Sequence, residues 1–289
     1  MQKVPELLIP LNNWKSLSPE LSVLENCDAV YFGLQSNFSM RARAGNFSVG
    51  DLPDLVKKVH GFNKKIYLCT NIVIYDDELK SLAENIDLAK IVGVDAIICH
   101  DPAAIMIARE KKIPEIHIST QANISNLKAV EFYESMGASR VIMSRELNLN
   151  QIKNIVDKSN IPVETFIHGA MCTSISGRCY FSSELMNFDP NFSANRGKCV
   201  QPCRRYYEFL GEEGEKIDFD PVSGMFFNAK DLCMIEHIDD LIETGISTFK
   251  VEGRMRDPLY ISTVAACYRE AIESYFNGTY SSDCIIWVL

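Results

Sequence analysis

The 289-residue sequence lacks any apolar run near the roughly 18 residues that a membrane-spanning helix requires, which excludes a membrane-spanning class. It also lacks a long apolar segment near Met1 of the kind found in secretory leaders, so we expect a cytoplasmic protein in a reducing compartment. Neither a His-Glu-x-x-His nor a Gly-x-Ser-x-Gly motif is present, so familiar signatures of zinc peptidases and serine hydrolases are missing. With 47% apolar and 23% charged residues, the composition excludes disordered and collagen-like chains and is typical of a globular protein.

Cysteine, by contrast, is abundant, with ten residues. Five stand singly in apolar surroundings, where a cysteine is usually a small buried hydrophobe; they are Cys27, Cys69, Cys99, Cys267 and Cys284. The other five fall in one stretch, at Cys172, Cys179, Cys199, Cys203 and Cys233. In a reducing compartment, clustered cysteines indicate metal or redox chemistry rather than disulfides.

Short β-rich apolar runs alternate with longer amphipathic stretches, which is the pattern of βα units around a parallel sheet. The eight runs are Glu6–Leu11, Ala29–Leu34, Lys65–Asn71, Ala96–Asp101, Glu115–Gln121, Arg140–Ser144, Val163–His168 and Thr248–Glu252. Gly93, Gly137 and Gly245 stand where helices should end before the next strand. Eight units on a chain of this length predict an α/β fold, a TIM-type (β/α)8 barrel. A doubly wound open sheet is the alternative, because a strand count alone does not prove closure.

Function in such a barrel lies at the carboxyl ends of the strands, and those ends are polar here. Helix capping accounts for Ser, Thr, Asp and Asn at these places, but it accounts poorly for Arg, His and Gln. We therefore predict a substrate pocket formed by Arg41, Arg43, Asn71, His100, Gln121, Arg145, Lys250 and Arg254. The arginines would suit a small dicarboxylate, because guanidinium groups bind carboxylates through two parallel hydrogen bonds.

Three further residues at strand ends are candidates for acid–base catalysis: Glu164, His168 and Glu252. They flank the cysteine-rich stretch. The alternative for the two glutamates is a structural role in ion pairs with Lys250 or Arg254.

One connection is much longer than a usual βα loop: about 80 residues separate the seventh and eighth runs, and all five clustered cysteines lie there. Two strand-like stretches, Arg205–Leu210 and Gly224–Asn228, flank an acidic turn and predict a hairpin. The stretch Asp231–Thr244 is expected to form a helix that carries Cys233. We expect one barrel domain over residues 1–280, with residues 169–233 as a cysteine-rich insertion and residues 281–289 as a tail.

The cysteine spacing leaves three kinds of chemistry open. A structural zinc site usually has two close cysteine pairs, and only Cys199 and Cys203 form one here. A 4Fe–4S cluster tolerates irregular spacing because each thiolate binds its own iron. Reactive or incidental thiols are the third alternative.

Four blocks of the sequence resemble signatures of the peptidase U32 family, also called the collagenase-like proteases. The longest, from Glu164 to Ser183, reads ETFIHGAMCTSISGRCYFSS, and the others are Asn195–Arg204, Lys230–Cys233 and Phe249–Arg256. The resemblance covers residues 1–280. The block MRARAGNF, at Met40–Phe47, is most similar to the branch of the family that acts in tRNA hydroxylation.

The resemblance implies a barrel with a 4Fe–4S cluster and a role in oxygen-independent or prephenate-dependent hydroxylation of tRNA wobble uridine, ribosomal RNA or the ubiquinone ring. For this chain it implies formation of 5-hydroxyuridine in tRNA, with prephenate as a co-substrate. The implied cluster ligands are Cys172, Cys179, Cys199 and Cys233, with Cys203 as the alternative. Some members act in pairs, so a hetero-oligomer with a related family member, in which this chain is a non-catalytic cluster carrier, is a second hypothesis.

The peptidase activity in the family name is a third hypothesis. Cys172 lies four residues after His168, which allows a Cys–His dyad, but a thiolate bound to iron would be unavailable as a nucleophile. The net charge of −9 argues mildly against RNA binding. Basic residues interleaved with aromatics argue for it, since they suit phosphate contact and base stacking. These residues are Arg178, Arg196, Lys198, Arg204 and Arg205, beside Tyr180, Phe181, Tyr206 and Tyr207. Alternatively, the aromatics pack around the cluster and the arginines neutralise its charge.

Overall fold

The structure, a computed structural model, describes residues 3–35, 38–217 and 224–281, and its centre is a closed barrel of eight parallel strands. The barrel strands are β1 (Glu6–Pro10), β2 (Ala29–Phe32), β3 (Lys65–Thr70), β4 (Ala96–Cys99), β5 (Glu115–Ile118), β6 (Arg140–Ile142), β7 (Val163–Gly169) and β11 (Thr248–Val251). Strand β7 pairs in parallel with both β6 and β11, and this closes the ring. The prediction of a TIM-type barrel is therefore confirmed, and the alternative prediction of a doubly wound open sheet was wrong. Each of the eight runs corresponds to one strand, and β7 extends one residue beyond its run, to Gly169.

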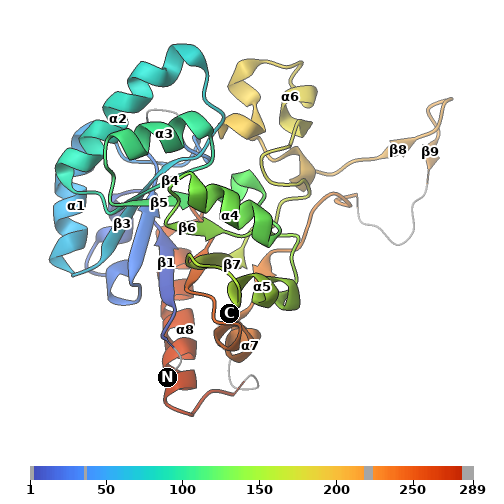
Figure 1. Ribbon diagram of the computed structural model, residues 1–289. Helices are drawn as coiled ribbons and strands as arrows, with labels where there is room; N and C mark the ends of the chain where they lie inside the picture. The colour runs from blue at the N-terminus through green and yellow to red at the C-terminus, as the bar shows by residue number, and fades with distance from the viewer. Residues whose placement is uncertain (1–2, 36–37, 218–223, 282–289) are drawn as a thin grey trace.

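Helices surround the barrel (Figure 1). They are α1 (Leu52–Gly61), α2 (Leu79–Val92), α3 (Pro102–Glu110), α4 (Leu127–Ser135), α5 (Leu149–Val156), α7 (Ile238–Glu243) and α8 (Pro258–Phe276). Gly93, Gly137 and Gly245 have φ angles of 89°, 98° and 78°, so each ends a helix in the left-handed conformation that glycine adopts without strain.

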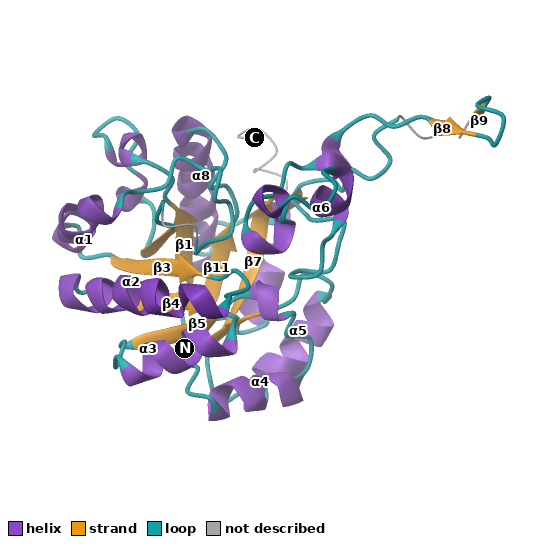
Figure 2. Ribbon diagram, turned by 90° about the horizontal axis from the view of Figure 1, so that it is seen from above, coloured by secondary structure: helices purple, strands orange, loops and turns teal. Residues whose placement is uncertain are grey.

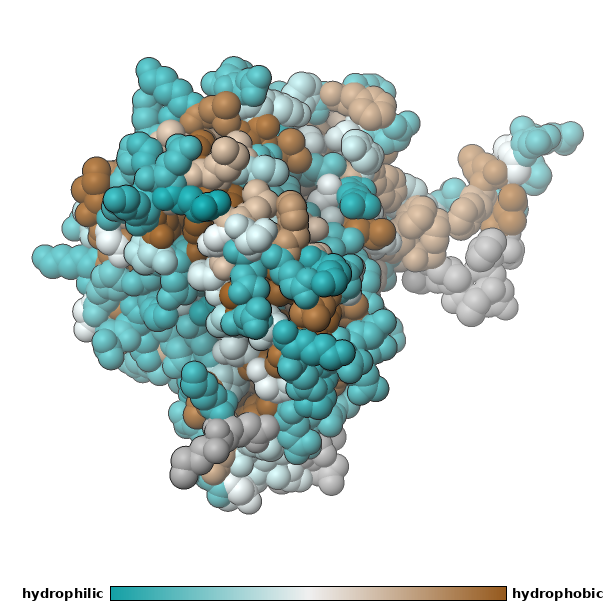
Figure 3. Space-filling view, in the orientation of Figure 1, coloured by the Kyte–Doolittle hydropathy of each residue, from teal (hydrophilic) through white to brown (hydrophobic). Residues whose placement is uncertain are grey.

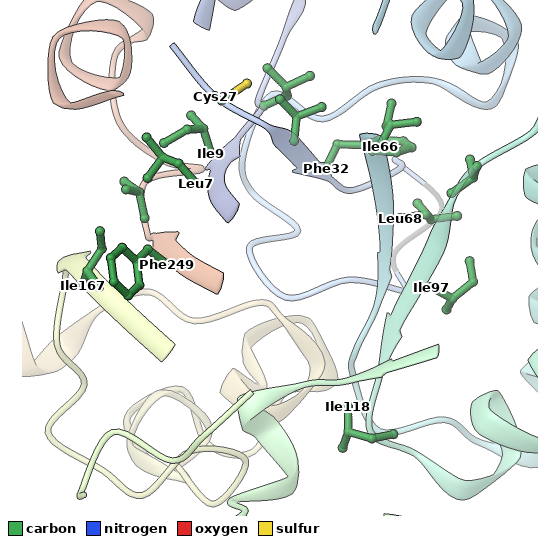
Figure 4. Packing of buried hydrophobic residues seen from close by; sticks show 14 of the residues in the cluster. Leu7, Ile9, Cys27, Phe32, Ile66, Leu68, Ile97, Ile118, Ile167 and Phe249 are labelled. Atoms are coloured by element: carbon green, nitrogen blue, oxygen red, sulfur yellow. The ribbon is translucent and has the colours of Figure 1, made fainter. Parts of the chain in front are cut away.

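The strands bury both of their faces. Outward side chains such as Ile9, Phe32 and Phe249 pack under the helices (Figure 4), whereas Tyr31 and Tyr67 belong to a second cluster inside the barrel. The four single cysteines within the described residues are buried, as expected: Cys27, Cys69, Cys99 and Cys267. Cys284 lies outside the described residues. Within the part of the chain that is described, no helix combines the length and apolar character that a bilayer crossing requires.

The insertion between β7 and β11 is built from short elements. They are α6 (Phe181–Leu185), the 3-10 turns η6 (Pro190–Phe192), η7 (Ala194–Arg196) and η8 (Pro202–Arg204), the hairpin strands β8 (Phe209–Leu210) and β9 (Lys216–Ile217), and β10 (Leu232–Cys233). The hairpin projects from the barrel as an arm, whereas α6 lies close to the body (Figure 2).

Two expectations for the insertion were wrong. The second hairpin strand is Lys216–Ile217 rather than Gly224–Asn228, because the turn closes at once through a hydrogen bond from Gly211 N to Glu215 O of 2.8 Å. The stretch Asp231–Thr244 is not one helix. Leu232 and Cys233 pair antiparallel with the end of β7 and supply partners for its backbone, so the helix begins only at Ile238.

Candidate functional site

A cavity of about 130 Å³ lies at the carboxyl ends of the barrel strands, beneath the insertion. Its lining brings together seven of the residues expected at the site: Arg41, Asn71, Gln121, Arg145, Lys250, Glu252 and Arg254. Four of the clustered cysteines line the same cavity: Cys172, Cys179, Cys199 and Cys203. Strand-end side chains and insertion thiols therefore face one space.

Two glycines hold the insertion directly against the barrel loops. Gly177 has a φ of +76°, and a Cβ there would lie 2.5 Å from the carbonyl oxygen of Gln121. Gly197 also has a φ of +76°, and its Cβ would lie 2.4 Å from the carbonyl oxygen of Ser39. Any other residue would be strained and would push the loops apart. The sequence thus fixes the insertion closely over the cavity.

The backbone around Cys199 directs donors at its sulfur. Gln201 adopts a left-handed conformation with φ of 54°, and its N–H donates to Cys199 Sγ at 3.2 Å. The Ser182 hydroxyl donates to the same sulfur at 3.4 Å. Pro202 then begins η8, which carries Cys203. Hydrogen bonds to the sulfurs are among the features by which proteins tune an iron–sulfur cluster.

The other thiols of the cavity are close enough to affect the pKa of Cys203. Burial, together with the negative charge of Cys172 and Cys199 in their thiolate form, raises the pKa of Cys203. Arg204 connects η8 to the segment just before Cys172 by donating to the carbonyl oxygen of Met171 at 3.1 Å. A bound metal would offset the repulsion between these negative charges, because the thiolate is the form of cysteine that binds metal.

Positive charge dominates the rest of the lining. Arg41 pairs with Glu252 at 3.0 Å. Arg254, only 3% exposed, donates to Ser39 Oγ at 3.1 Å and to Asn46 Oδ1 at 2.6 Å. Arg145 lies over the Phe166 ring, with its guanidinium carbon 5.1 Å from the centroid.

Lys250 connects this cavity to a layer of buried charges inside the barrel. Its ammonium lies 2.8 Å from Glu164 and 4.4 Å from the centroid of the Tyr31 ring. Glu164 is fully buried, also pairs with Arg140 at 3.4 Å, and does not line the cavity. The structural alternative for Glu164, an ion pair with Lys250, is therefore what the structure shows.

Four other candidates lie away from the cavity lining. His168 faces α8, with its ring nitrogens 2.7 Å from Tyr260 Oη and 3.3 Å from Tyr268 Oη. Burial lowers the pKa of His168 and of His100. Arg43 donates to Asn191 O at 3.3 Å. Cys233 lies on β10, opposite His168.

The sequence predictions missed several lining residues, among them Tyr31, Cys69 and Ser119. The alternation along β2 and β3 contained a signal for the first two, because Tyr31 and Cys69 lie on the inward face of their strands. Cys69 was correctly expected to be buried, but not at the cavity floor. Ser119 holds Asn71 through a hydrogen bond of 3.0 Å, a tertiary contact with no local signature.

The donor set fits a cluster whose thiolates are spread over several irons. Among the described residues, no three His, Cys, Asp or Glu side chains lie close enough to share one metal ion. A 4Fe–4S cluster does not require such sharing, because each of four thiolates binds a different iron. Four thiols around one cavity, with cations beside them, meet that requirement.

The fold and the cavity define a class: (β/α)8 barrel proteins with a cysteine-rich insertion over the barrel mouth. Comparison with known proteins makes the assignment specific. The sequence model of peptidase family U32 matches residues 14–285, and the chain belongs to this family.

Relatives with different names match nearly the whole chain. An uncharacterized protease of Methanocaldococcus jannaschii is 41% identical over 97% of this chain and 68% of its own length. A collagenase of Porphyromonas gingivalis is 39% identical, with coverage of 97% and 68%. The tRNA hydroxylation protein P1 of Bacillus subtilis is 35% identical, with coverage of 94% and 64%. Membership of the family therefore does not distinguish the hydroxylation branch from the protease names.

Solved structures agree on the fold. The structure of a U32 peptidase covers 86% of this chain and 93% of its own, with a TM-score of 0.56 and 14% identity. At that identity the likeness shows the barrel alone.

Proposed function

We propose that this protein is an iron–sulfur enzyme that hydroxylates RNA, with the wobble uridine of tRNA as its substrate and 5-hydroxyuridine as its product. The observation that carries the proposal is the cavity that four thiols and several cations share at the barrel mouth. The name of the Bacillus subtilis relative supports the choice of tRNA. An enzyme acting on tRNA would work in the cytoplasm.

The cluster ligands follow from the thiols that face the cavity. Cys172, Cys179 and Cys199 belong to the set that the family resemblance implies, and all three line it. The resemblance gives Cys233 as the fourth ligand, but Cys233 does not line the cavity and its strand is paired with β7. Cys203, the alternative, is already there. We therefore take Cys203 as the fourth ligand.

A bound cluster would supply electron transfer, and the protein's own residues would bind and orient the reactants. Arg254 and Lys250 place positive charge where an anionic co-substrate such as the dicarboxylate prephenate would enter. Glu164 holds the buried Lys250 ammonium in an ion pair at 2.8 Å. Glu252, held by Arg41, is the carboxylate at the cavity and the remaining candidate for proton transfer.

The RNA-binding hypothesis applies to part of the basic and aromatic set. Phe181 and Tyr207 stack on each other, with centroids 5.9 Å apart, and Arg196 pairs with Glu78, so these residues serve the protein itself. Tyr180 and Tyr206 are 66% and 76% exposed. Figure 3 shows hydrophobic side chains along the segment leading to the β8–β9 hairpin. Exposed tyrosines beside basic residues suit base stacking and phosphate contact.

The peptidase hypothesis has less support in the geometry. A Cys–His dyad would need His168 beside Cys172, but Cys172 lines the cavity while His168 is held between Tyr260 and Tyr268. The test is a peptide-cleavage assay with purified, folded Cys172→Ala protein. Cleavage by this variant would exclude Cys172 as the nucleophile.

The proposal is tested first by anaerobic purification, iron counting and visible absorption. We expect about four irons per chain in the wild type, loss of the absorption band in Cys203→Ser, and retention of the band in the exposed control Cys233→Ser. The reverse pattern would reassign the fourth ligand to Cys233. Wild-type protein without iron would overturn the cluster altogether.

Mass analysis of tRNA then tests the reaction. A deletion strain should lack 5-hydroxyuridine at the wobble position, and the wild-type gene should restore it where Cys172→Ser does not. Restoration that requires a second family member would show a heteromeric enzyme. Unchanged tRNA in the deletion strain would overturn the substrate assignment.

A further inference from the structure

The charge balance of the cavity singles out one residue. Three of its cations have a carboxylate partner: Arg41 has Glu252 at 3.0 Å, Lys250 has Glu164 at 2.8 Å, and Arg204 has Asp231 at 3.5 Å. Arg145 and Arg254 have none among the described residues. The cavity therefore holds positive charge that the described chain does not neutralise.

Arg254 has a structural reason to be there. Its Nη2 donates to Ser39 and Asn46, and its guanidinium occupies the space that a Cβ on Gly33 would fill, since that Cβ would lie 2.0 Å from Arg254 Nη2. Neutral oxygens and close packing thus fix this side chain. Its position does not depend on an added anion.

Arg145 is different. Among the described residues its side chain makes one hydrogen bond, to the carbonyl oxygen of Ala170 at 3.3 Å, two residues before Cys172. Its Nε, like that of Arg254, is buried without a partner among these residues. Burial lowers the pKa of Arg145, while the nearby Cys172 thiolate opposes that effect. A partly buried cation whose Nε is enclosed in this way calls for a negative group beside it.

We propose that Arg145 is the counter-charge of the iron–sulfur cluster and raises its reduction potential. This inference rests on the proposed function. Four thiolates bound to a 4Fe–4S core leave the group with a net negative charge, and cluster potentials depend on local charge and solvent exposure. A partly buried cation close to Cys172 favours the reduced state, which carries one more negative charge. Arg145 thus acts through the cluster as a positioning residue and does not contact substrate.

The test is a redox titration of the anaerobic protein, followed by electron paramagnetic resonance, with iron counted in each sample. Arg145→Gln should keep its iron and show a lower midpoint potential than the wild type, whereas Arg145→Lys, which keeps the charge, should stay close to the wild type. Arg178→Gln is the control, because Arg178 adjoins Cys179 but is exposed and screened by solvent. Its shift should be smaller.

Each outcome of this titration supports or contradicts a stated part of the proposal. An unchanged potential in Arg145→Gln with full iron would overturn the inference, as would an equal shift in Arg178→Gln. Loss of iron in Arg145→Gln but not in Arg145→Lys would support it, because charge alone restores the cluster. Loss in both variants would show that the side chain only places the Cys172 loop, against the inference. Absence of iron from the wild type would instead mark failure of the proposed function.

Discussion

Glu164 is fully buried, yet it stays charged because two cations approach it inside the barrel. Burial alone would raise its pKa, but Lys250 at 2.8 Å and Arg140 at 3.4 Å outweigh that effect and hold the pKa below its ordinary value. Arg140 also forms an ion pair with Glu6, with its Nη1 2.6 Å from Glu6 Oε1. These contacts order the interior beneath the candidate site.

Replacing Glu164 with Gln should therefore destabilise the protein strongly. The change leaves Lys250 and Arg140 without a buried partner, and breaking a buried pair in this way costs about 3–5 kcal/mol. Urea unfolding would measure the loss. The control is Glu131→Gln, which removes an exposed pair with Lys128 at 2.6 Å and should cost about 0–1 kcal/mol. Equal losses in the two variants would contradict this account.

The same pair predicts a pH dependence. Because the pKa of Glu164 is lowered in the folded state, its stabilising contribution is present above the unfolded pKa of about 4.3 and is lost as the pH falls through the folded pKa. The difference in unfolding free energy between the wild type and Glu164→Gln should shrink as the pH is lowered from 7 toward 3. A constant difference across that range would mean that Glu164 is not charged in the folded protein.

At the level of elements, Tyr268 joins α8 to the end of β7 and to β10. Its hydroxyl donates to Ile167 O at 2.9 Å and accepts from Met234 N at 3.1 Å. Tyr268→Phe removes both bonds, but Met234 N also donates to Ile167 O at 3.0 Å, so each backbone group keeps one partner. The change should therefore cost about 0.5–1.5 kcal/mol. Thermal unfolding measures the loss. The exposed Tyr206→Phe should change stability by less than about 0.5 kcal/mol, and a similar value for Tyr268→Phe would show that water replaces the hydroxyl.

The elements also show what local pattern predicts and what it does not. Each barrel strand was predictable, because its apolar run is a local property that the fold uses unchanged. Strand β10 was not predictable, because Leu232 and Cys233 lie in a helical sequence pattern and become extended through their tertiary pairing with β7. At the site, strand ends predicted that residues such as Arg41 and Arg145 would meet. His168 departs from that expectation: the register of β7 and β11 shifts between Lys250 and Val251, and its ring faces α8.

Over the whole molecule, the candidate site exists only while the insertion stays seated on the barrel. Arg196 reaches from η7 to Glu78 and to Val73 O, and its guanidinium lies 4.3 Å from the centroid of the Tyr75 ring. Gly177 places the segment between Cys172 and Cys179 against the loop after β5. Half of the site belongs to the barrel and half to the insertion, so its geometry depends on these contacts.

Gly177→Ala should accordingly damage the site as well as the fold. The new Cβ would lie 2.5 Å from Gln121 O at a φ of +76°, so the loops must separate and the thiols must move apart. Gly214→Ala is matched in backbone conformation, with φ of +83°, but nothing lies within 4 Å of its Cβ. The control should show only the backbone strain of about 1–2 kcal/mol, with unchanged iron content. Gly177→Ala should unfold at lower temperature than the control and bind less iron. Full iron with no greater destabilisation would mean that the insertion tolerates displacement from the barrel, and that the cluster site is built within the insertion alone.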